Sequence, residues 1–407
     1  MRKLILLAFA LLPSLVFAQG FQVNLEGQKQ TGMGETGTGF PQDGAAVFFN
    51  PGAVVMLPQN YIQAGVSPLL FESAFNPSGT NAQFHTATKI VPPFTFYAAL
   101  GPKSAWWKLG FAVYTPFGGV ANWGDNWTGK YALESLNLRS YYFQPTLSVK
   151  LAKNLSIGAG FVYDRGTVDL TQAIPLSNQS GQDGQAELIG AGHGYGWNSG
   201  IYYKPSEKLS IGITYRSKVN TTINNGSAVF TVPGSLQSLF PQPNTFTSSI
   251  PLPSTTSLGL GFFPTKKLTL AFDFNYVGWS VYKQLDFIYA HTTADLQNTY
   301  SQRDYKNAYT LRVGGQYQLT SCFALRAGGG YAATAVRDGY VTPEAPDANR
   351  VFFTGGLGYR AGHHFDVDVS FEYEDLLART QTNIQTQLSG TFKTNVYIPG
   401  ISLAYHW

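Results

Sequence analysis

Charged side chains are scarce in this sequence, where they make up 12% of 407 residues. A soluble domain of ordinary composition carries about twice that share. Hydrophobic residues are ordinary at 44%, but aromatic residues reach 15% and glycine occupies 44 positions. A surface with so little charge cannot face water everywhere. The composition therefore predicts that much of the molecule faces an apolar medium.

Long hydrophobic runs are missing as well. Beyond residue 18, no stretch approaches the 18 or more consecutive apolar residues of a membrane-spanning helix. This excludes a bundle of transmembrane helices and leaves a closed β-barrel as the structure that could span a bilayer. The single cysteine, Cys322, excludes a disulfide within the chain. The net charge is only +4 and no basic run is present, so we expect no nucleic-acid partner.

Signatures of catalysis are also absent. The six histidines show no spacing with serine or acidic residues that specifies a nucleophile, a base or a metal site. The pattern Gly32-x-Gly34-x-x-Gly37 has the spacing of a dinucleotide fingerprint, but polar NLEGQKQ precedes it and TGFPQDG follows it. The fingerprint requires a buried strand before these glycines and a helix after them. We therefore expect no enzymatic activity, no cofactor and no metal.

The chain begins with a secretory signal peptide. In MRKLILLAFALLPSLVFAQG, two basic residues precede an apolar core, and Val16 and Ala18 are the small residues before a cleavage site. Residues 1–18 should be removed, so the mature protein is expected to be exported.

What the rest of the chain does contain is alternation. The last segment, Ile401–Trp407, alternates apolar with small or polar side chains up to its final aromatic residue. Barrel strands alternate in this way between lipid and lumen. Similar alternation occurs at 155–170, 209–223, 268–287, 309–319, 323–336 and 365–375.

The links between these segments alternate in length. Short links lie at 151–154, 204–208, 264–267, 319–322 and 361–364, and long ones near 117–137, 174–192, 224–251, 290–307, 337–349 and 377–389. Outer-membrane barrels have short periplasmic turns and long external loops. We predict an all-β fold, a 14-stranded antiparallel transmembrane β-barrel over residues 61–407, in the outer membrane of a Gram-negative bacterium. Both termini should be periplasmic, and the final strand ending in Trp407 is the expected contact for the barrel-assembly machinery.

Residues 19–60 precede the first barrel-like strand. They are too few for a separate domain, and AAVFFNPGAVVML is too apolar for a free tail. Burial inside the barrel would resolve both points, so we expect this segment to be a small N-terminal hatch that plugs the lumen. A secreted β-sandwich or solenoid also has many short strands, but it does not explain the alternating links.

Several motifs resemble one family. Gly20-Phe21, Gly32-Met33-Gly34 and Asn50-Pro51, then YTPFGG, SIGAGFVYDR, LPSTTSLGLGF and YKNAYTLRVGG, occur in the order found in the FadL family of outer-membrane transporters of hydrophobic compounds. The resemblance covers nearly the whole mature chain. One departure is a glycine after Asn-Pro, where the family usually has alanine. The hatch residues that the resemblance indicates are Asp43, Asn50, Pro51 and Gly52.

The resemblance implies passive transport of long-chain fatty acids or of other hydrophobic molecules such as aromatic hydrocarbons. External loops would capture the ligand, the lumen would hold it, the hatch would rearrange, and a gap at the third strand would release it sideways. A general porin or a surface adhesin remains the alternative of another class. The implied gap residues are Pro116, Phe117, Gly118 and Gly119. Proline and paired glycines weaken a strand ladder, although Pro116 could simply end a strand.

Ligand contacts are also implied by the resemblance. Arg165 and Lys306, with the hydroxyl of Thr115, would bind the head group of a fatty acid. The alternative is that the two cations lie on the outer rim, where they would bind phosphates of lipopolysaccharide. An initial capture groove could be formed by Trp123, Trp127, Phe240 and Phe246. For these four residues, packing between loops or a place in an interfacial girdle is the alternative.

Overall fold

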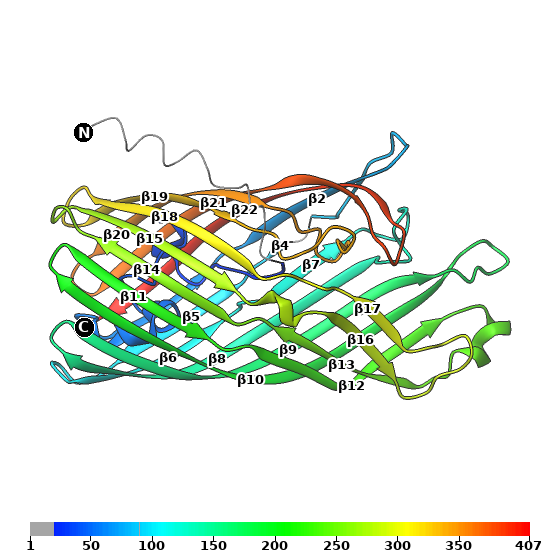
Figure 1. Cartoon of the computed structure of the whole chain (residues 1–407), viewed down its shortest axis with the longest axis horizontal. Coiled ribbons are helices and arrows are strands. Elements are labelled where there is room, and N and C mark those ends of the chain that lie inside the picture. Colours follow the sequence, from blue (N-terminus) through cyan, green and yellow to red (C-terminus); the bar gives the residue numbers. More distant parts are fainter. Residues whose placement is uncertain (1–19, 89) are drawn as a thin grey trace, which may run out of the picture.

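The wall of the molecule is one closed antiparallel β-barrel that surrounds a short N-terminal segment (Figure 1). The structure is a computed structural model and describes residues 20–88 and 90–407. The predicted signal peptide, residues 1–18, lies outside the described residues. The barrel closes where β1 (Tyr61–Val66) pairs with β22 (Ser389–His406), with Tyr61 opposite His406. The predicted 14-stranded antiparallel barrel is confirmed.

Several of the fourteen wall strands are divided into two or three shorter elements. The remaining elements are, in chain order, β2 (Leu69–Pro77), β3 (Phe84–His85), β4 (Ile90–Val91), β5 (Phe94–Leu100), β6 (Trp107–Tyr114), β7 (Gly118–Asn122), β8 (Ser135–Ala152), β9 (Leu155–Ile174), β10 (Gly184–Ser206), β11 (Leu209–Arg216), β12 (Val219–Thr231), β13 (Asn244–Leu252), β14 (Thr255–Phe262), β15 (Leu268–Val277), β16 (Gln284–Tyr289), β17 (Thr299–Gln302), β18 (Ala308–Gln318), β19 (Phe323–Ala332), β20 (Arg350–Ala361) and β21 (Phe365–Thr382). Two short 3₁₀ helices, η2 (Gly234–Leu239) and η3 (Trp279–Val281), lie in connections between them.

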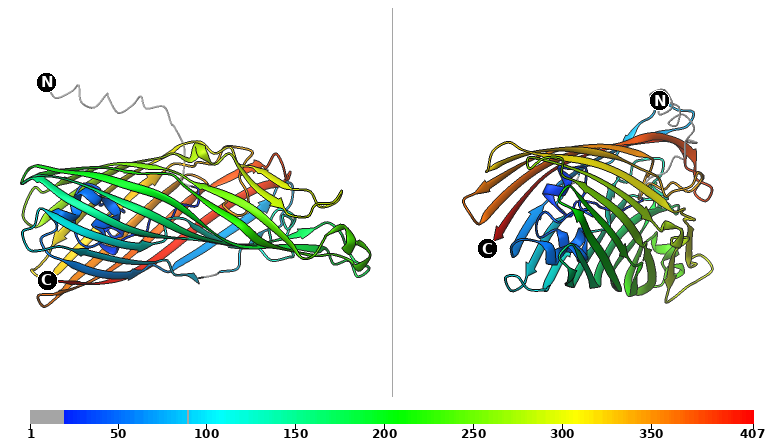
Figure 2. Two further views of the ribbon diagram at one scale, coloured as in Figure 1. Left: turned by 90° about the horizontal axis from the view of Figure 1, so that it is seen from below. Right: turned by 60° about the vertical axis from the view of Figure 1, so that its left-hand side comes forward.

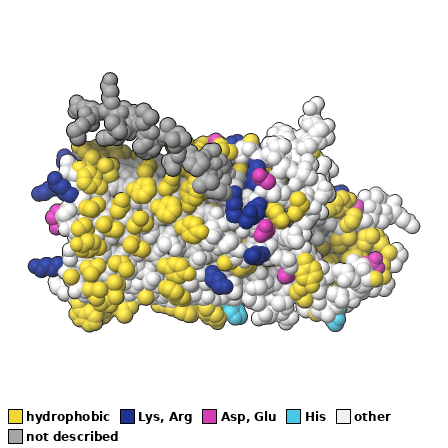
Figure 3. Space-filling model, in the orientation of Figure 1, with side chains coloured by type: hydrophobic (Ala, Val, Ile, Leu, Met, Phe, Trp, Pro, Cys, Tyr) yellow, Lys and Arg dark blue, Asp and Glu magenta, His cyan; other side chains and the backbone are white. Residues whose placement is uncertain are grey.

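The side chains that alternate in the sequence point to opposite faces of the barrel wall. In β22, Leu403 is 53% exposed on the outside, whereas Ser402 is 3% and Ala404 1% exposed on the inside. Figure 3 shows hydrophobic side chains in a broad band over the strands, with Lys and Arg at one edge and in a group beyond the band. An apolar band of this kind is what a barrel presents to lipid. None of the helices in the described residues is long and apolar enough to cross a membrane.

The two ends of the barrel differ as predicted. The end that carries the C-terminus has short turns, and the opposite end has long connections (Figures 1 and 2). The expected long loop at 174–192 is mostly strand, because β10 begins at Gly184 and pairs with β9 up to Ile174. The strand ladder therefore continues beyond the apolar band before the chain turns.

The N-terminal segment lies inside the barrel near the short-turn end (Figure 2). It contains α1 (Gln28–Thr31), α2 (Ala46–Phe49) and the 3₁₀ helix η1 (Pro51–Met56). Nearly all of its side chains between residues 25 and 55 are buried, polar ones included. We call residues 20–60 the hatch from here on.

Candidate functional site

Two of the expected hatch residues organise its polar interior. Asp43 is fully buried and accepts hydrogen bonds from the Ala45 backbone N–H at 3.0 Å, from Gln30 at 3.1 Å and from Gln63 of β1 at 3.2 Å. Asn50 donates to the carbonyl of Thr38 within the hatch at 3.0 Å. Each residue thus satisfies buried backbone or amide groups that have no water available.

The Asn50-Pro51-Gly52 turn joins the hatch to the wall. The Asn50 side chain donates to the carbonyl of Ile201 on β10 at 3.1 Å and accepts from the Gly52 N–H at 3.0 Å, which caps η1. A Cβ on Gly52 would stand 2.5 Å from the carbonyl oxygen of Gly200. The close approach of the two backbones explains why glycine replaces the usual alanine here.

The glycines of the Gly32-x-Gly34 pattern also allow a close approach between the hatch backbone and the wall. Gly34 has a φ of +67°, and a Cβ there would lie 2.4 Å from the carbonyl oxygen of Val313 on β18. A residue with a side chain would meet both backbone strain and a clash. The Gly32-x-Gly34 pattern therefore allows the hatch backbone to lie directly against the barrel wall.

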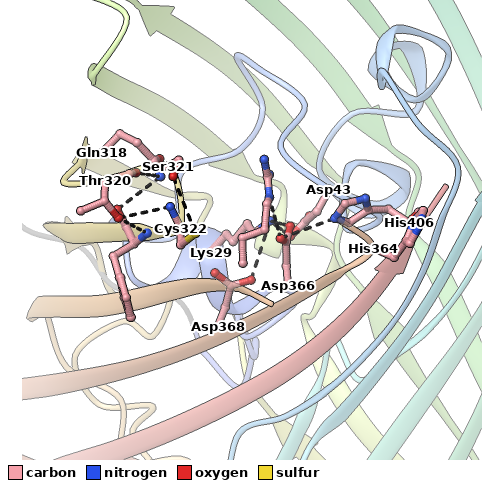
Figure 4. Close-up of polar contacts among 12 residues, drawn as sticks. Lys29, Asp43, Gln318, Thr320, Ser321, Cys322, His364, Asp366, Asp368 and His406 are labelled. Carbon is pink, nitrogen blue, oxygen red and sulfur yellow. Dashed lines mark hydrogen bonds and ion pairs between the residues drawn. The ribbon is translucent and has the colours of Figure 1, made fainter. Parts of the chain in front are cut away.

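An ionic cluster ties the hatch to the wall near the short-turn end (Figure 4). The ammonium of Lys29 lies 2.9 Å from Asp366, 3.7 Å from Asp368 and 4.0 Å from Asp43. Burial alone would lower the pKa of Lys29, but the surrounding carboxylates raise it above its ordinary value. Two wall arginines complete the cluster, since Arg326 pairs with Asp368 at 2.7 Å and Arg360 with Asp366 at 3.1 Å.

A second charged contact joins the hatch to β21. One carboxylate oxygen each of Glu35, Glu372 and Glu374 lies within 4.8 Å of the other two. Glu35 pairs with Arg312 at 2.6 Å, and Glu374 with Arg350 at 2.7 Å. Among the described residues, no N–H or hydroxyl group donates to the buried carboxylate oxygens of Glu372, and Glu35 lies within hydrogen-bonding reach of them. Burial raises the pKa of Glu35 to about 7, although Arg312 opposes this effect.

The wall is interrupted between β6 and β7. β6 pairs with both β5 and β8, but among the described residues the ladder of β7 runs along β8 alone. The hatch occupies part of the vacated edge, because the Val23 N–H donates to the Pro116 carbonyl at 2.9 Å and the Gly118 N–H donates to the Phe21 carbonyl at 3.1 Å. The start of the hatch thus adds a short strand-like contact at the break.

A cavity of about 400 Å³ lies at this break. Its inner wall includes Leu25 of the hatch and Val396 of β22, which face the lumen. Its outer wall includes Phe94 of β5 and Tyr141 of β8, which are on the outward face and whose rings are 5.8 Å apart. The cavity therefore extends from the lumen through the wall, in the size range of small-molecule sites.

Polar groups are a minority of the cavity lining, and several of them gather at its inner end. The Oγ1 atom of Thr115 is buried without a hydrogen-bond partner. Arg350 lies at the inner end but is already paired with Glu374 at 2.7 Å and with Asp347 at 3.4 Å. Arg139 lies at the outer mouth, and its side chain is exposed. The inner end of the cavity thus combines apolar side chains with one arginine whose charge is neutralised by acidic neighbours.

The expected site residues fall into three places. Thr115, Gly118 and Gly119 line the cavity, whereas Pro116 and Phe117 line a smaller cavity of about 40 Å³ on the other side of the break. Arg165 is exposed on the outward face of β9 and does not line either cavity. This position favours the alternative in which Arg165 lies on the outer rim and does not bind the ligand in the lumen.

Lys306 does not reach the cavity either. It is half-buried between β17 and β18, and its backbone N–H donates to the carbonyl of Ala335 at 2.9 Å. The structure therefore does not bring Thr115, Arg165 and Lys306 together.

The aromatic residues of the expected capture groove are buried in two clusters. Trp123 and Trp127 stack at 4.7 Å, and their indole N–H groups donate to backbone carbonyls at 3.1 and 2.8 Å. Phe240 packs on Phe230 and Phe246 on Phe287, at ring distances of 5.6 and 5.4 Å. Phe230, Phe246 and Phe287 belong to β12, β13 and β16, so the two phenylalanines of the expected groove pack against side chains of neighbouring strands.

Sequence reasoning missed the apolar lumen side of the cavity. Val396 and Ile398 point inward from β22, where the inward residues nearer the short-turn end are Ser402 and Ala404. The change from small or polar to branched apolar residues on one strand face could have indicated the apolar side of the cavity. Arg139 was also missed, because its exposure at the mouth depends on the break in the neighbouring strand.

Comparisons with known proteins agree with this architecture. The family described as "Outer membrane protein transport protein (OMPP1/FadL/TodX)" matches residues 9–407. The long-chain fatty acid transport protein of Escherichia coli (strain K12) is 24% identical over 412 residues, which cover 90% of each chain. A Pseudomonas aeruginosa FadL homologue of known crystal structure has a TM-score of 0.82 at 19% identity, covering 95% of this chain and 99% of that one.

A second solved structure is the toluene transporter TodX of Pseudomonas putida. It has a TM-score of 0.68 at 15% identity and covers 96% of this chain and 98% of its own. The structural likenesses show a common fold, and the family match extends over the whole barrel and hatch. The chain belongs to the OMPP1/FadL/TodX family of outer-membrane transport proteins, which are channels for hydrophobic compounds and not enzymes.

Proposed function

We propose that the protein is a passive channel in which a hydrophobic ligand leaves the lumen sideways through the break between β6 and β7. External loops capture the ligand, and the cavity beside Thr115 holds it. Rearrangement of the hatch around Asn50-Pro51 then opens the route. The observation that supports this proposal is the single cavity lined by both lumen-facing Leu25 and outward-facing Phe94. A ligand on this route would not need to cross water.

Long-chain fatty acids are the proposed substrates. The curated relative at 24% identity is named a long-chain fatty acid transport protein, and the apolar cavity suits an alkyl chain. Its buried Thr115 hydroxyl has no hydrogen-bond partner among the described residues, so it is available to donate to a carboxylate. A hydrogen bond to a charged group contributes about 1.5–3 kcal/mol when it is shielded from water.

Uncharged hydrocarbons are the second candidate. The cation at the inner end of the cavity, Arg350, is held by Glu374 and Asp347. These two acids outnumber it, so the inner end does not attract a carboxylate. A neutral aromatic or aliphatic molecule would bind there without any charge to compensate.

Equilibrium binding to the detergent-purified protein separates the two candidates. A long-chain fatty acid and an uncharged hydrocarbon of similar size should be compared on the wild type, on Thr115→Val and on Thr115→Ser. If fatty acids are the substrate, Thr115→Val weakens acid binding about tenfold, which is about 1.4 kcal/mol. Thr115→Ser should restore it, because it retains the hydroxyl.

Hydrocarbon binding serves as the internal control. It should be unchanged by Thr115→Val, whose side chain has nearly the same size as threonine. Equal binding of both ligands with no effect of the substitution would support the uncharged substrate instead. Failure of both ligands to bind would contradict the proposed channel.

A further inference from the structure

Cations gather on the outer face of three neighbouring strands. Arg165 of β9 is directly opposite His193 of β10 on one side and Tyr141 of β8 on the other. Arg139 is the next outward-facing residue of β8. Residues directly opposite each other have Cβ atoms about 5 Å apart, and diagonal neighbours are about 7–8 Å apart. We call Arg139, Arg165 and His193 the outer basic patch.

The level of this patch follows from the strand geometry. Leu151 and Tyr141 lie ten residues apart on the outward face of β8. This separation is about 34 Å along a strand and about 25 Å across the bilayer at the usual tilt, which is the height of an outer-membrane apolar band. The patch therefore lies at the boundary of the band, on the side away from the short turns.

An aromatic row lies immediately on the membrane side of the patch. Phe143, Tyr163 and Tyr195 face outward on β8, β9 and β10, with ring centroids 6.0 and 5.6 Å apart. Aromatic girdles mark the interface between hydrocarbon and head groups. The cations thus stand where the polar heads of outer-leaflet lipids begin.

One outward-facing acid, Asp169 of β9, lies beside the patch. The side chain of Arg139 donates to the amide oxygen of Asn137 at 3.0 Å, and both Arg139 and Arg165 are exposed. Asp164 is buried on the opposite face. Asp169 is four residues, or about 13 Å, beyond Arg165 along β9, but it is a diagonal neighbour of Arg139, which lies opposite Thr167. The two arginines and His193 outnumber this single acid.

We propose that the outer basic patch binds the phosphate groups of a phosphorylated glycolipid, the lipopolysaccharide of the outer leaflet. Exposed guanidinium groups match phosphate oxygens in charge and in hydrogen-bond geometry. The imidazole of His193 adds an N–H donor beside Arg165. The acyl chains of the same lipid lie against Phe143, Tyr163 and Tyr195. One lipid molecule thus contacts both the outer basic patch and the aromatic row.

The position of the patch relates it to the break in the wall. Arg139 and Tyr141 line the outer mouth of the cavity, whereas Arg165 and His193 do not. A glycolipid held by the patch would place its acyl chains beside this mouth. The lipid would then shield the opening from water on the outside.

The test compares lipids that differ only in phosphate. Binding of bisphosphorylated lipid A and of its dephosphorylated form to the detergent-purified full chain should be measured by native mass spectrometry. We expect the phosphorylated lipid to bind the wild type at least tenfold more tightly. Arg165→Gln/His193→Gln should remove most of this preference while leaving the cavity lining intact.

The matched control is Lys103→Gln/Lys153→Gln, which changes two exposed cations in turns at the opposite end and should leave lipid binding unchanged. Equal binding of the two lipids to the wild type, or full retention of the preference by the double variant, would overturn the proposal. Inorganic pyrophosphate provides a further arm. If it bound as tightly as lipid A, the patch would be a site for free phosphate and not for a glycolipid.

Discussion

Among single residues, Glu372 is the one whose buried carboxyl group has the fewest compensating contacts. It points into the lumen beside the carboxyl groups of Glu35 and Glu374, and among the described residues no N–H or hydroxyl group donates to its buried carboxylate oxygens. The arginines of this region are already paired with Glu35 and Glu374. A buried carboxylate without a partner is costly unless it is protonated or shares a proton with a neighbour. The contact between hatch and β21 should therefore depend on pH.

The direction of this dependence follows from Glu35. Its pKa in the docked hatch is raised to about 7, from an ordinary value of 4.5. Below pH 4.5 the group is protonated whether the hatch is docked or released. Between pH 4.5 and 7 only the docked hatch retains the proton, so docking is most stable at low pH and loses stability as pH rises to about 7.

Glu372→Gln should weaken this pH dependence. Glu35 and Glu372 compete for a proton, and the amide removes one of these two carboxyl groups and can donate a hydrogen bond to the other. We expect amide hydrogen exchange of hatch residues 31–38, corrected for the intrinsic rate, to slow about tenfold at pH 7.5 and little at pH 5. Asp164→Asn, which changes a buried acid that accepts hydrogen bonds from Ser140 and Thr221 of the wall, is the control. A similar effect of both substitutions would show that the carboxyl cluster is not responsible.

At the scale of elements, the decisive feature is the interruption between β6 and β7. Gly119 lines the cavity, and a Cβ placed there would meet no atom within 4 Å. Gly119→Phe should therefore fill the opening without disturbing the wall. If the ligand leaves through this break, uptake of the substrate should fall at least tenfold, while assembly of the barrel is unchanged.

The matched control for this change is Gly234→Phe in η2. A Cβ at Gly234 also meets no atom within 4 Å, but the residue lies in an external connection. In cells that lack other uptake routes, substrate uptake through the Gly234→Phe variant should equal uptake through the wild type. Normal uptake by Gly119→Phe would mean that the ligand leaves by another path, through the lumen to the periplasm.

The strands themselves could be predicted from the sequence because alternation and turn lengths are local. The break at Pro116 was indicated by the loss of a ladder donor and by the two glycines that follow. The cavity was not predictable, because its walls come from the hatch, β5, β7, β8 and β22. The face of Arg165 was equally ambiguous, since parity alone does not tell which face of a strand is the lumen.

At the scale of the whole molecule, the hatch is the feature that distinguishes this protein from an open porin. Buried polar groups of the hatch pair with wall residues, as Lys29 does with Asp366 and Glu35 with Arg312, and these contacts exist only while the hatch is docked. The docked hatch should therefore allow little ion conductance in a planar bilayer. An adhesin, by contrast, would not require the hatch at all.

Lys29→Met tests this dependence on the hatch. Lys29 supplies the hatch cation that faces Asp366 at 2.9 Å and Asp368 at 3.7 Å. Removing one partner of a buried ion pair costs about 3–5 kcal/mol, because the remaining charge is left uncompensated. The hatch of this variant should leave the wall part of the time, so single-channel conductance should rise above the wild-type level. Lys29→Arg retains the positive charge and should conduct like the wild type. If Lys29→Met conducts no more than Lys29→Arg, the ionic cluster does not hold the hatch, and the glycine-mediated backbone contacts at Gly34 and Gly52 must be sufficient on their own.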